Sequence, residues 1–163
     1  MIADIISTFD KRGKGFAVVE GIKNSNKEFA VWIDDDGQYD NKEIPLFVDK
    51  NYDLVCGYRD WDTVPFKHRL ANKLINFIFN TRFRSHFKDI SCGFVGFNRK
   101  FMNTFLKEYS GGGYEVDYKI KLIALEHQMK IKQVPVTVTY NEKSDNIRGI
   151  IMVFYIIKRI LKE

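Results

Sequence analysis

Along this chain, apolar residues occur in two patterns: short continuous runs, and positions spaced as on one face of a helix. Continuous apolar runs at 28–34 and 52–58 predict buried strands. Residues 66–80 carry apolar side chains at helical spacing. We also predict strands at 4–8, 90–97 and 130–140, and helices at 14–25, 99–108 and 115–128. Alternating strands and helices predict an α/β fold, with a mostly parallel sheet flanked by helices.

The apolar run at 28–34 ends abruptly in carboxylates. Asp34, Asp35 and Asp36 are followed by Gly37 and Gln38. In open α/β sheets, ligands bind at the carboxyl ends of strands, and residues two apart in a regular strand point the same way. Converging carboxylates need a cation between them, so Mg²⁺ or Mn²⁺ with oxygen ligands is one interpretation. The other is a solvated acidic turn, because Asp-Gly is also common in turns.

Charge and cysteine content narrow the class of protein. The chain has 26 Lys and Arg against 21 Asp and Glu, a net charge of +5. This balance suits an anionic partner such as a nucleotide, a lipid phosphate or a membrane surface, although a lysine-rich solvated surface has the same charge. Cys56 and Cys92 lie in apolar segments, which predicts buried reduced thiols. The opening residues resemble no signal or transit peptide, so we expect a cytoplasmic protein.

The C-terminal segment, 146–163, is predicted to be an amphipathic helix separate from the domain at 1–145. Its apolar block at 150–157 is shorter than the roughly 20 residues that a spanning helix needs, and Lys158 and Arg159 follow it. One interpretation places this helix in the membrane interface, with its basic end among the headgroups. The other packs it on the protein or on a second subunit.

Two segments interleave aromatic and basic residues, at 66–69 and at 82–88. Such a pattern binds single-stranded nucleic acid by stacking and phosphate contact. It equally suits a membrane face, where aromatic rings lie at headgroup depth and basic residues contact anionic lipid.

Several short blocks then occur in a definite order, covering about residues 13–144. They are Gly13-Lys14-Gly15 with Ala17 and Gly21, then Asp34 to Asp40, Tyr52 to Arg59, Arg69 to Leu74, Asp89 to Phe94, Tyr114 to Asp117, and Val134 to Val138. Together these blocks resemble the family 2 glycosyltransferases of the dolichyl-phosphate mannose synthase-like group. The resemblance implies a GT-A-like, Rossmann-related fold on the cytoplasmic face of the membrane.

The same resemblance implies an activity and a cofactor. The activity is metal-dependent transfer of a sugar from a nucleotide diphosphate sugar to a polyprenyl phosphate of the dolichyl type. Asp36 and Gln38 match metal ligands, and Asp34 matches a residue shared between the metal ion, Mg²⁺ or Mn²⁺, and the donor. A metal ion there would neutralise charge on the leaving diphosphate.

Basic residues would bind the phosphates in such a reaction. Arg59 and Arg69 match contacts to the acceptor phosphate or the diphosphate, a role that suits the two-pronged guanidinium. With Asp36 they form the predicted catalytic set. Lys14 lies near a helix start, where backbone N–H groups favour anions, and is a predicted substrate-binding residue.

The chain also departs from the family pattern. The family's first strand with P-x-Y-N-E, the helix after it and a second acid-ending strand have no counterpart here, so we expect an N-terminally truncated domain with impaired transfer activity. The strand at 28–34 would then need cover for its edge from residues 4–8, from a second copy of the chain or from a separate N-terminal polypeptide. Near Ser144, the arginine of the family's R-x-x-G-x-S is absent.

Other classes of function remain open at this point. An inactive or regulatory glycosyltransferase-like domain would keep the acidic strand without a donor pocket. A phosphatase of the haloacid dehalogenase type also has D-x-D-G after a strand, but Gln38 stands where it needs Thr or Ser. A nucleic-acid-binding module rests on charge and on 82–88 alone, and we expect no nucleic acid partner. For Glu115 and Asp117 we favour a pair stabilised by the helix dipole over an acceptor site.

Overall fold

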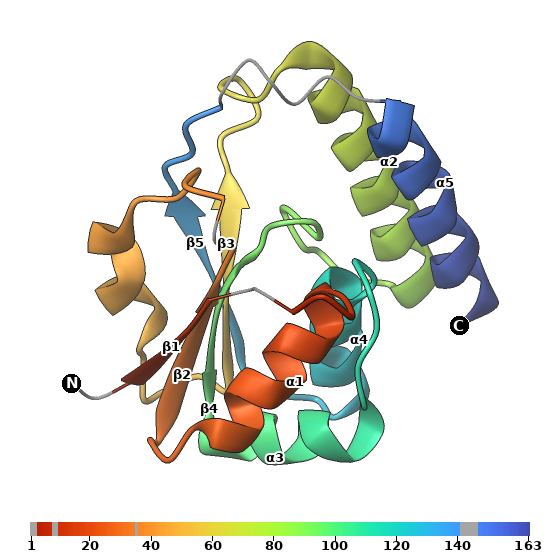
Figure 1. The fold of residues 1–163 in the computed structure, drawn as a ribbon. Helices are drawn as coiled ribbons and strands as arrows, with labels where there is room; N and C mark the ends of the chain where they lie inside the picture. Colours follow the sequence, from red (N-terminus) through yellow and green to blue (C-terminus); the bar gives the residue numbers. More distant parts are fainter. Residues whose placement is uncertain (1–2, 8–9, 35, 141–146) are drawn as a thin grey trace.

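A five-stranded sheet organises the chain, and the computed structural model describes residues 3–7, 10–34, 36–140 and 147–163 (Figure 1). The strands are β1 (Ala3–Ser7), β2 (Phe29–Ile33), β3 (Leu54–Arg59), β4 (Phe94–Asn98) and β5 (Ile131–Val136). The helices are α1 (Lys14–Asn24), α2 (Phe66–Phe83), α3 (Arg99–Glu108), α4 (Val116–Glu126), α5 (Ile147–Lys162) and the 3₁₀ helix η1 (Asn41–Phe47). The predicted α/β fold is confirmed.

The strand order is β1-β2-β4-β3-β5. The pairs β1–β2 and β3–β5 are parallel, but β4 runs antiparallel to both β2 and β3. The sheet is therefore mixed, whereas the sequence predicted a mostly parallel one. The difference is β4, which lies between β2 and β3 and runs in the opposite direction to both. Pro135 lies in β5 at the edge of the sheet, where its missing N–H costs no ladder bond.

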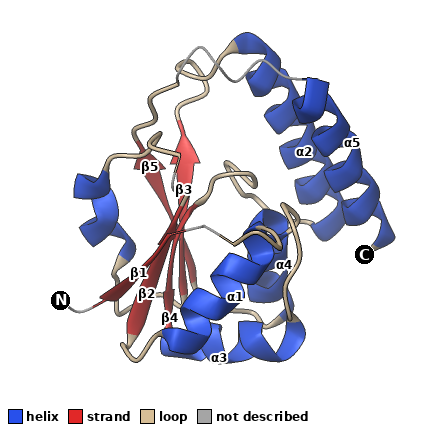
Figure 2. Cartoon of the chain, in the orientation of Figure 1, coloured by secondary structure: helices blue, strands red, loops and turns tan. Residues whose placement is uncertain are grey.

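Both faces of the central strands are covered, which explains their continuous apolar runs. Helices α1, α3 and α4 lie on one side of the sheet, and η1 lies on the other (Figure 2). Along β2, Ala30 and Trp32 join the core on the helix side, and Phe29, Val31 and Ile33 join the core beside η1. This alternation is the two-residue period of a strand buried on both faces.

Strand β1 covers the outer edge of β2. Its residues pair in parallel register, from Ala3 opposite Phe29 to Ser7 opposite Ile33. Of the three ways in which we expected this edge to be covered, the structure has the one that uses the chain's own short strand.

Two strands are shorter than predicted, because side chains capture their backbone donors. The predicted strand 90–97 begins only at Phe94, since Ile90 N–H donates to Asn76 Oδ1 at 3.0 Å and Ser91 N–H donates to Asp89 Oδ1 at 3.1 Å. The strand predicted at 130–140 spans Ile131–Val136. Directly after the strand, the backbone N–H of Thr137 donates to the carboxylate of Glu43 in η1.

Helices α2 and α5 lie side by side at one corner of the molecule (Figure 1). Ile156 and Ile160 of α5 are buried in the main core, so packing on the protein is the interpretation that the structure supports for this face. Among the described residues, no helix has the length and apolar content needed to cross a membrane.

The interpretation of 82–88 as a surface cluster of aromatic and basic residues needs correction. Phe87 is buried, and its ring lies 6.0 Å from that of Phe79. The ring of Phe83 lies 4.7 Å from the same Phe79. Apolar burial draws these two rings inward, so they are not available for stacking with bases or lipid.

Candidate functional site

Asp34 is the first residue after β2, and its side chain lies beside Gly93, just before β4. The backbone N–H of Asp34 donates to the carbonyl of Gly93 at 3.0 Å. A Cβ at position 93 would overlap the Asp34 carboxylate, so only glycine permits this approach. The close approach of Asp34 therefore explains why the block Asp89 to Phe94 has a glycine at position 93.

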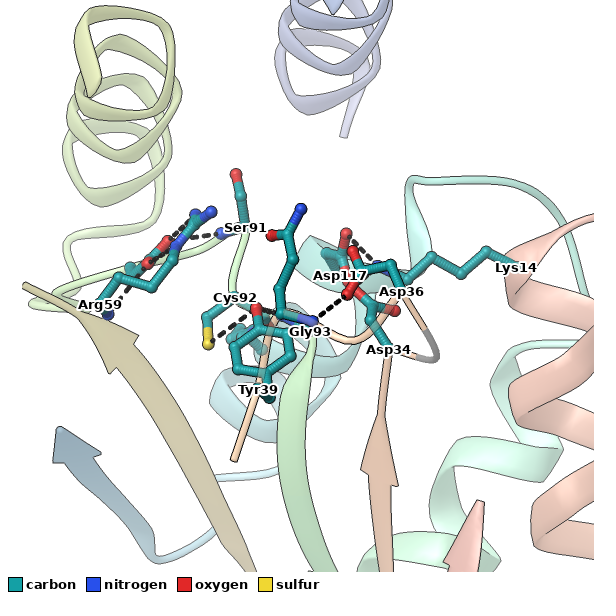
Figure 3. A network of polar contacts seen from close by, with 12 residues as sticks. Lys14, Asp34, Asp36, Tyr39, Arg59, Ser91, Cys92, Gly93 and Asp117 are labelled. Atoms are coloured by element: carbon teal, nitrogen blue, oxygen red, sulfur yellow. Dashed lines mark hydrogen bonds and ion pairs between the residues drawn. The ribbon is translucent and has the colours of Figure 1, made fainter. Parts of the chain in front are cut away.

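Lys14 is the cation at this point of the structure. Its Nζ lies 2.9 Å from Asp34 Oδ2 and 2.9 and 3.0 Å from the two carboxylate oxygens of Asp117, which projects from the first turn of α4 (Figure 3). The ammonium also lies 4.7 Å from the centre of the Trp32 ring, a cation–π distance. The structure thereby joins α1, β2 and α4 through one side chain.

Glycines set the start of α1 so that Lys14 can reach in. Gly13 has a φ of 139°, which side-chain-bearing residues rarely adopt. Gly15 N–H donates to the carbonyl of Gly112 at 2.9 Å, and a Cβ at position 15 would overlap the hydroxyl of Tyr109. The helix start is therefore pressed against the loop before α4, which carries Asp117.

Burial and charge act in opposite directions on this cluster. Burial lowers the pKa of Lys14, but the carboxylates of Asp117 and Asp34 outweigh it, so its pKa lies above the ordinary value. Burial raises the pKa of Asp117, and the neighbouring Asp34 raises it further against the opposing effect of Lys14. The carboxylates of Asp34 and Asp117 thus share the ammonium of Lys14, and the buried Lys121 also lowers the pKa of Asp117.

The other two predicted metal ligands follow in the loop. Asp36 is exposed, and its Oδ1 accepts a hydrogen bond from the backbone N–H of Gln38 at 3.0 Å. The carboxylate and amide oxygens of Asp34, Asp36 and Gln38 are hard donors of the type that Mg²⁺ and Mn²⁺ prefer. Within the described part of the chain, no group of three or more His, Cys, Asp or Glu side chains is arranged to hold a metal ion.

Arg59 forms a second buried ion pair. Its Nε and Nη2 donate to the two carboxylate oxygens of Asp89 at 2.7 and 2.9 Å, and its Nη1 donates to the hydroxyl of Tyr140 at 3.3 Å. Burial lowers the pKa of Arg59, but Asp89 outweighs it and holds that pKa above its ordinary value. The guanidinium is thus bound bidentately by a partner within the protein.

A short segment connects the two ion clusters. Asp89 begins it, and Gly93 ends it with its N–H donating to the hydroxyl of Tyr39 at 3.2 Å. Between them, Cys92 Sγ lies 3.6 Å from the same hydroxyl, and the carbonyl of Cys92 accepts from Nζ of the buried Lys121 at 3.1 Å. Figure 3 shows Tyr39 and Cys92 between Arg59 and the Lys14 cluster.

Arg69 makes local contacts on α2. Its Nη1 lies 3.3 Å from a carboxylate oxygen of Asp62, and its Nε and Nη2 each lie 3.3 Å from the carbonyl of Val64. The structure therefore unites Lys14 with Asp34, and places Arg59 and Arg69 in separate contacts.

The sequence patterns did not reveal the roles of three buried residues: Asp117 and Asp89 form ion pairs, and Lys121 donates to a backbone carbonyl. Asp117 stood in the block Tyr114 to Asp117, but its place at a helix start favoured the dipole interpretation. Asp89 stood in the D-x-x-C-G-F block with no role assigned. Lys121 lies between apolar residues of a helix, and no sequence signal marks its bond to a carbonyl.

The carboxylates and the ammonium of this cluster meet at the carboxyl end of a central strand, the edge of an α/β sheet where ligands bind. The sequence model for glycosyl transferase family 2 matches residues 4–108. The chain belongs to this family.

Other proteins and solved structures are similar to this chain. The chain is 28% identical to the uncharacterised protein MJ0544 of Methanocaldococcus jannaschii, over 97% of this chain and 74% of that protein. The crystal structure of glucosyl-3-phosphoglycerate synthase from Mycobacterium tuberculosis in complex with phosphoglyceric acid matches with a TM-score of 0.71 at 15% identity. That match covers 95% of this chain and 56% of the synthase.

A second crystal structure of this synthase, with Mn²⁺ and uridine-diphosphate-glucose, has a TM-score of 0.71 at 14% identity and covers 94% of this chain and 55% of that one. At such identity these matches establish the fold, which is that of the GT-A glycosyltransferases. The chain spans just over half the length of these synthases.

Proposed function

We propose that this chain takes part in metal-dependent transfer of a sugar from a nucleotide diphosphate sugar to an acceptor that bears a phosphate. The observation that carries the proposal is the convergence of Asp34 and Asp117 on one cation at the end of β2, in a chain of glycosyltransferase family 2. The structural relatives support the ligand classes, since their crystals contain Mn²⁺, uridine-diphosphate-glucose and phosphoglyceric acid.

In this proposal, Asp34, Asp36 and Gln38 hold Mg²⁺ or Mn²⁺, which when bound neutralises charge on the departing diphosphate. The acceptor phosphate is already anionic, so the protein needs mainly to position it and to stabilise charge. Lys14, Arg59 and Arg69 are the proposed phosphate contacts. For Arg59, the group nearest to a ligand role is Nη1, because Nε and Nη2 are held by Asp89.

We further propose that the acceptor is a polyprenyl phosphate presented at a membrane surface. Large apolar side chains are exposed along one face of α2, at Phe66, Leu70, Leu74 and Phe77. Their spacing of four, four and three residues puts them on one stripe of the helix. On the adjacent α5, Phe154, Tyr155 and Leu161 are exposed as well.

Basic residues are exposed on the same two helices, Lys73 and Arg82 on α2 and Lys158, Arg159 and Lys162 on α5. Apolar area and positive charge on one surface reinforce each other in binding to anionic lipid. We call this surface, formed by the exposed residues of α2 and α5, the α2–α5 face.

The transfer activity is tested with purified chain, Mn²⁺, a panel of nucleotide sugars that includes uridine-diphosphate-glucose, and two acceptors, a short polyprenyl phosphate and phosphoglyceric acid. Mass spectrometry of the products identifies donor and acceptor together. Asp36→Asn should lower transfer by about 100-fold, because it removes a hard ligand from an exposed loop and leaves the core intact. Glu126→Gln, an exposed acid at the end of α4, is the matched control. Because we expect transfer by this chain to be impaired, the assay uses high protein concentration and long incubation. Equal activity of Asp36→Asn and the unaltered chain, or no transfer above background with any pair, would contradict the proposal.

The membrane part is tested by flotation with vesicles. The chain should float with vesicles containing phosphatidylglycerol and much less with phosphatidylcholine alone. The double variant Leu70→Ser/Phe77→Ser should lose flotation, whereas Leu46→Ser, which removes an exposed apolar residue from η1, should keep it. Equal flotation of the double variant and the unaltered chain would remove the α2–α5 face from the proposal.

A further inference from the structure

Lys14 places its ammonium between two carboxylates in a largely buried site. Its side chain is only 12% exposed, and those of Asp34 and Asp117 are 21% and 12% exposed. Three carboxylate oxygens lie within 3.0 Å of its Nζ. The ring of Trp32 closes the site from another side.

This arrangement has a consequence for any second cation. An ammonium and a divalent ion both seek the same carboxylate oxygens, and two cations in one partly buried site repel each other strongly. Asp34 Oδ2, the oxygen bound to Lys14, belongs to the residue that the proposed metal site also needs.

We propose that Lys14 is a built-in competitor of the divalent metal: its ammonium and the metal ion exclude each other at Asp34 and Asp117, and the ion binds as Lys14 leaves. This inference rests on the proposed function for the identity of the metal. It adds Asp117 as a second carboxylate exposed to the ion when Lys14 departs, and it makes Lys14 a positioning residue that keeps the two carboxylates together in the absence of metal.

The geometry gives Lys14 the means to leave. It is the first residue of α1, and the chain on its N-terminal side enters through Gly13 at a φ of 139°. Its four-carbon side chain carries a point charge with no fixed fork, so it can turn without disturbing the helix. Asp34 and Asp117, by contrast, are fixed by the sheet edge and by the first turn of α4.

The experiment measures Mn²⁺ binding by electron paramagnetic resonance, with the metal alone and no nucleotide. Lys14→Met keeps the length of the side chain and removes its charge. We expect the Kd for Mn²⁺ to fall by about tenfold or more, since the ion no longer has to displace an ammonium from two carboxylates. Lys107→Met, on the exposed face of α3, is the matched control and should bind as the unaltered chain does.

Two further variants keep the inference falsifiable. Lys14→Arg retains the positive charge and should not tighten binding. Lys14→Met/Asp117→Asn should lose most of the gain, because the second carboxylate is gone. Thermal unfolding should show Lys14→Met destabilised without metal and restored by Mn²⁺ more than the unaltered chain is.

Unchanged or weaker Mn²⁺ binding by Lys14→Met would overturn the inference. If Lys14→Met binds Mn²⁺ more tightly but the unaltered chain transfers no sugar, the inference stands and the proposed function is wrong. The two failures are therefore distinct.

Discussion

Two ion clusters lie at the carboxyl-end side of the sheet, and they differ in how completely their charges are matched. At Arg59, one guanidinium meets one carboxylate through two parallel hydrogen bonds, and a tyrosine hydroxyl accepts from its third donor. At Lys14, one ammonium is shared by the carboxylates of Asp34 and Asp117.

The difference separates a structural pair from a site that is poised to bind. A matched bidentate pair has little to gain from a ligand, because a ligand would have to replace bonds that are already good. A cluster in which two carboxylates share one lysine ammonium can exchange that ammonium for a divalent cation, which interacts more strongly with the same carboxylates. By this argument, Lys14, Asp34 and Asp117 are the better candidates for chemistry, and Arg59 holds the segment 89–93 against β3.

The matched pair should show the largest effect on stability. Asp89→Ala leaves the buried guanidinium of Arg59 without its partner, and we expect a loss of about 3–5 kcal/mol in the free energy of unfolding. Urea denaturation followed by circular dichroism measures it. The double variant Arg59→Met/Asp89→Leu should recover most of the loss, because no buried charge is left unpaired.

A loss below about 1 kcal/mol in Asp89→Ala would show that Arg59 finds another partner. In that case the contrast between the two clusters would disappear.

More of the fold than of the candidate site could be predicted from the sequence. The buried strands β2 and β3 and the helix α2 follow from local patterns of apolar residues, and the structure agrees with them. The order of the strands does not follow from such patterns. That β4 lies between β2 and β3 depends on long-range pairing, which no local period encodes.

The site shows the same limit at the level of single residues. Asp34 could be found because it ends an apolar run, and Lys14 because it stands between glycines. Asp117 lies 103 positions from Lys14, and only the tertiary fold brings the two together. A helix-start carboxylate has an ordinary explanation in the dipole, so the local signal gave no reason to prefer a contact across the molecule.

The segment between the clusters offers a test by pH. Burial, together with the nearby Asp89, raises the pKa of the Cys92 thiol from 9.0 to about 11. The folded state therefore keeps its proton where the unfolded state loses it, so the stability from this group is fully present below pH 9 and is lost as pH rises towards 11.

We expect the unaltered chain to lose about 2–3 kcal/mol more than Cys92→Ala between these pH values, in urea denaturation at each pH. The variant is the proper reference because Cys56 and the tyrosines titrate in both chains. Parallel stability curves for the two chains would show that water reaches Cys92 and that the segment between the clusters is not closed.

The smallest effect is expected at the unmatched cluster, and it sharpens the comparison most directly. Asp117→Asn removes one of two carboxylates and leaves Lys14 paired with Asp34, while the amide oxygen still accepts a hydrogen bond. We expect the free energy of unfolding to change by no more than about 1 kcal/mol, since Lys14 keeps its ion pair with Asp34 and a neutral hydrogen bond replaces the lost charged one. Asp89→Asn is the matched comparison, because the same chemical change there removes the carboxylate that binds the buried guanidinium of Arg59. A loss in Asp117→Asn as large as that in Asp89→Asn would mean that the Lys14 cluster is held together as tightly as the Arg59 pair, and that it is a structural feature of the fold.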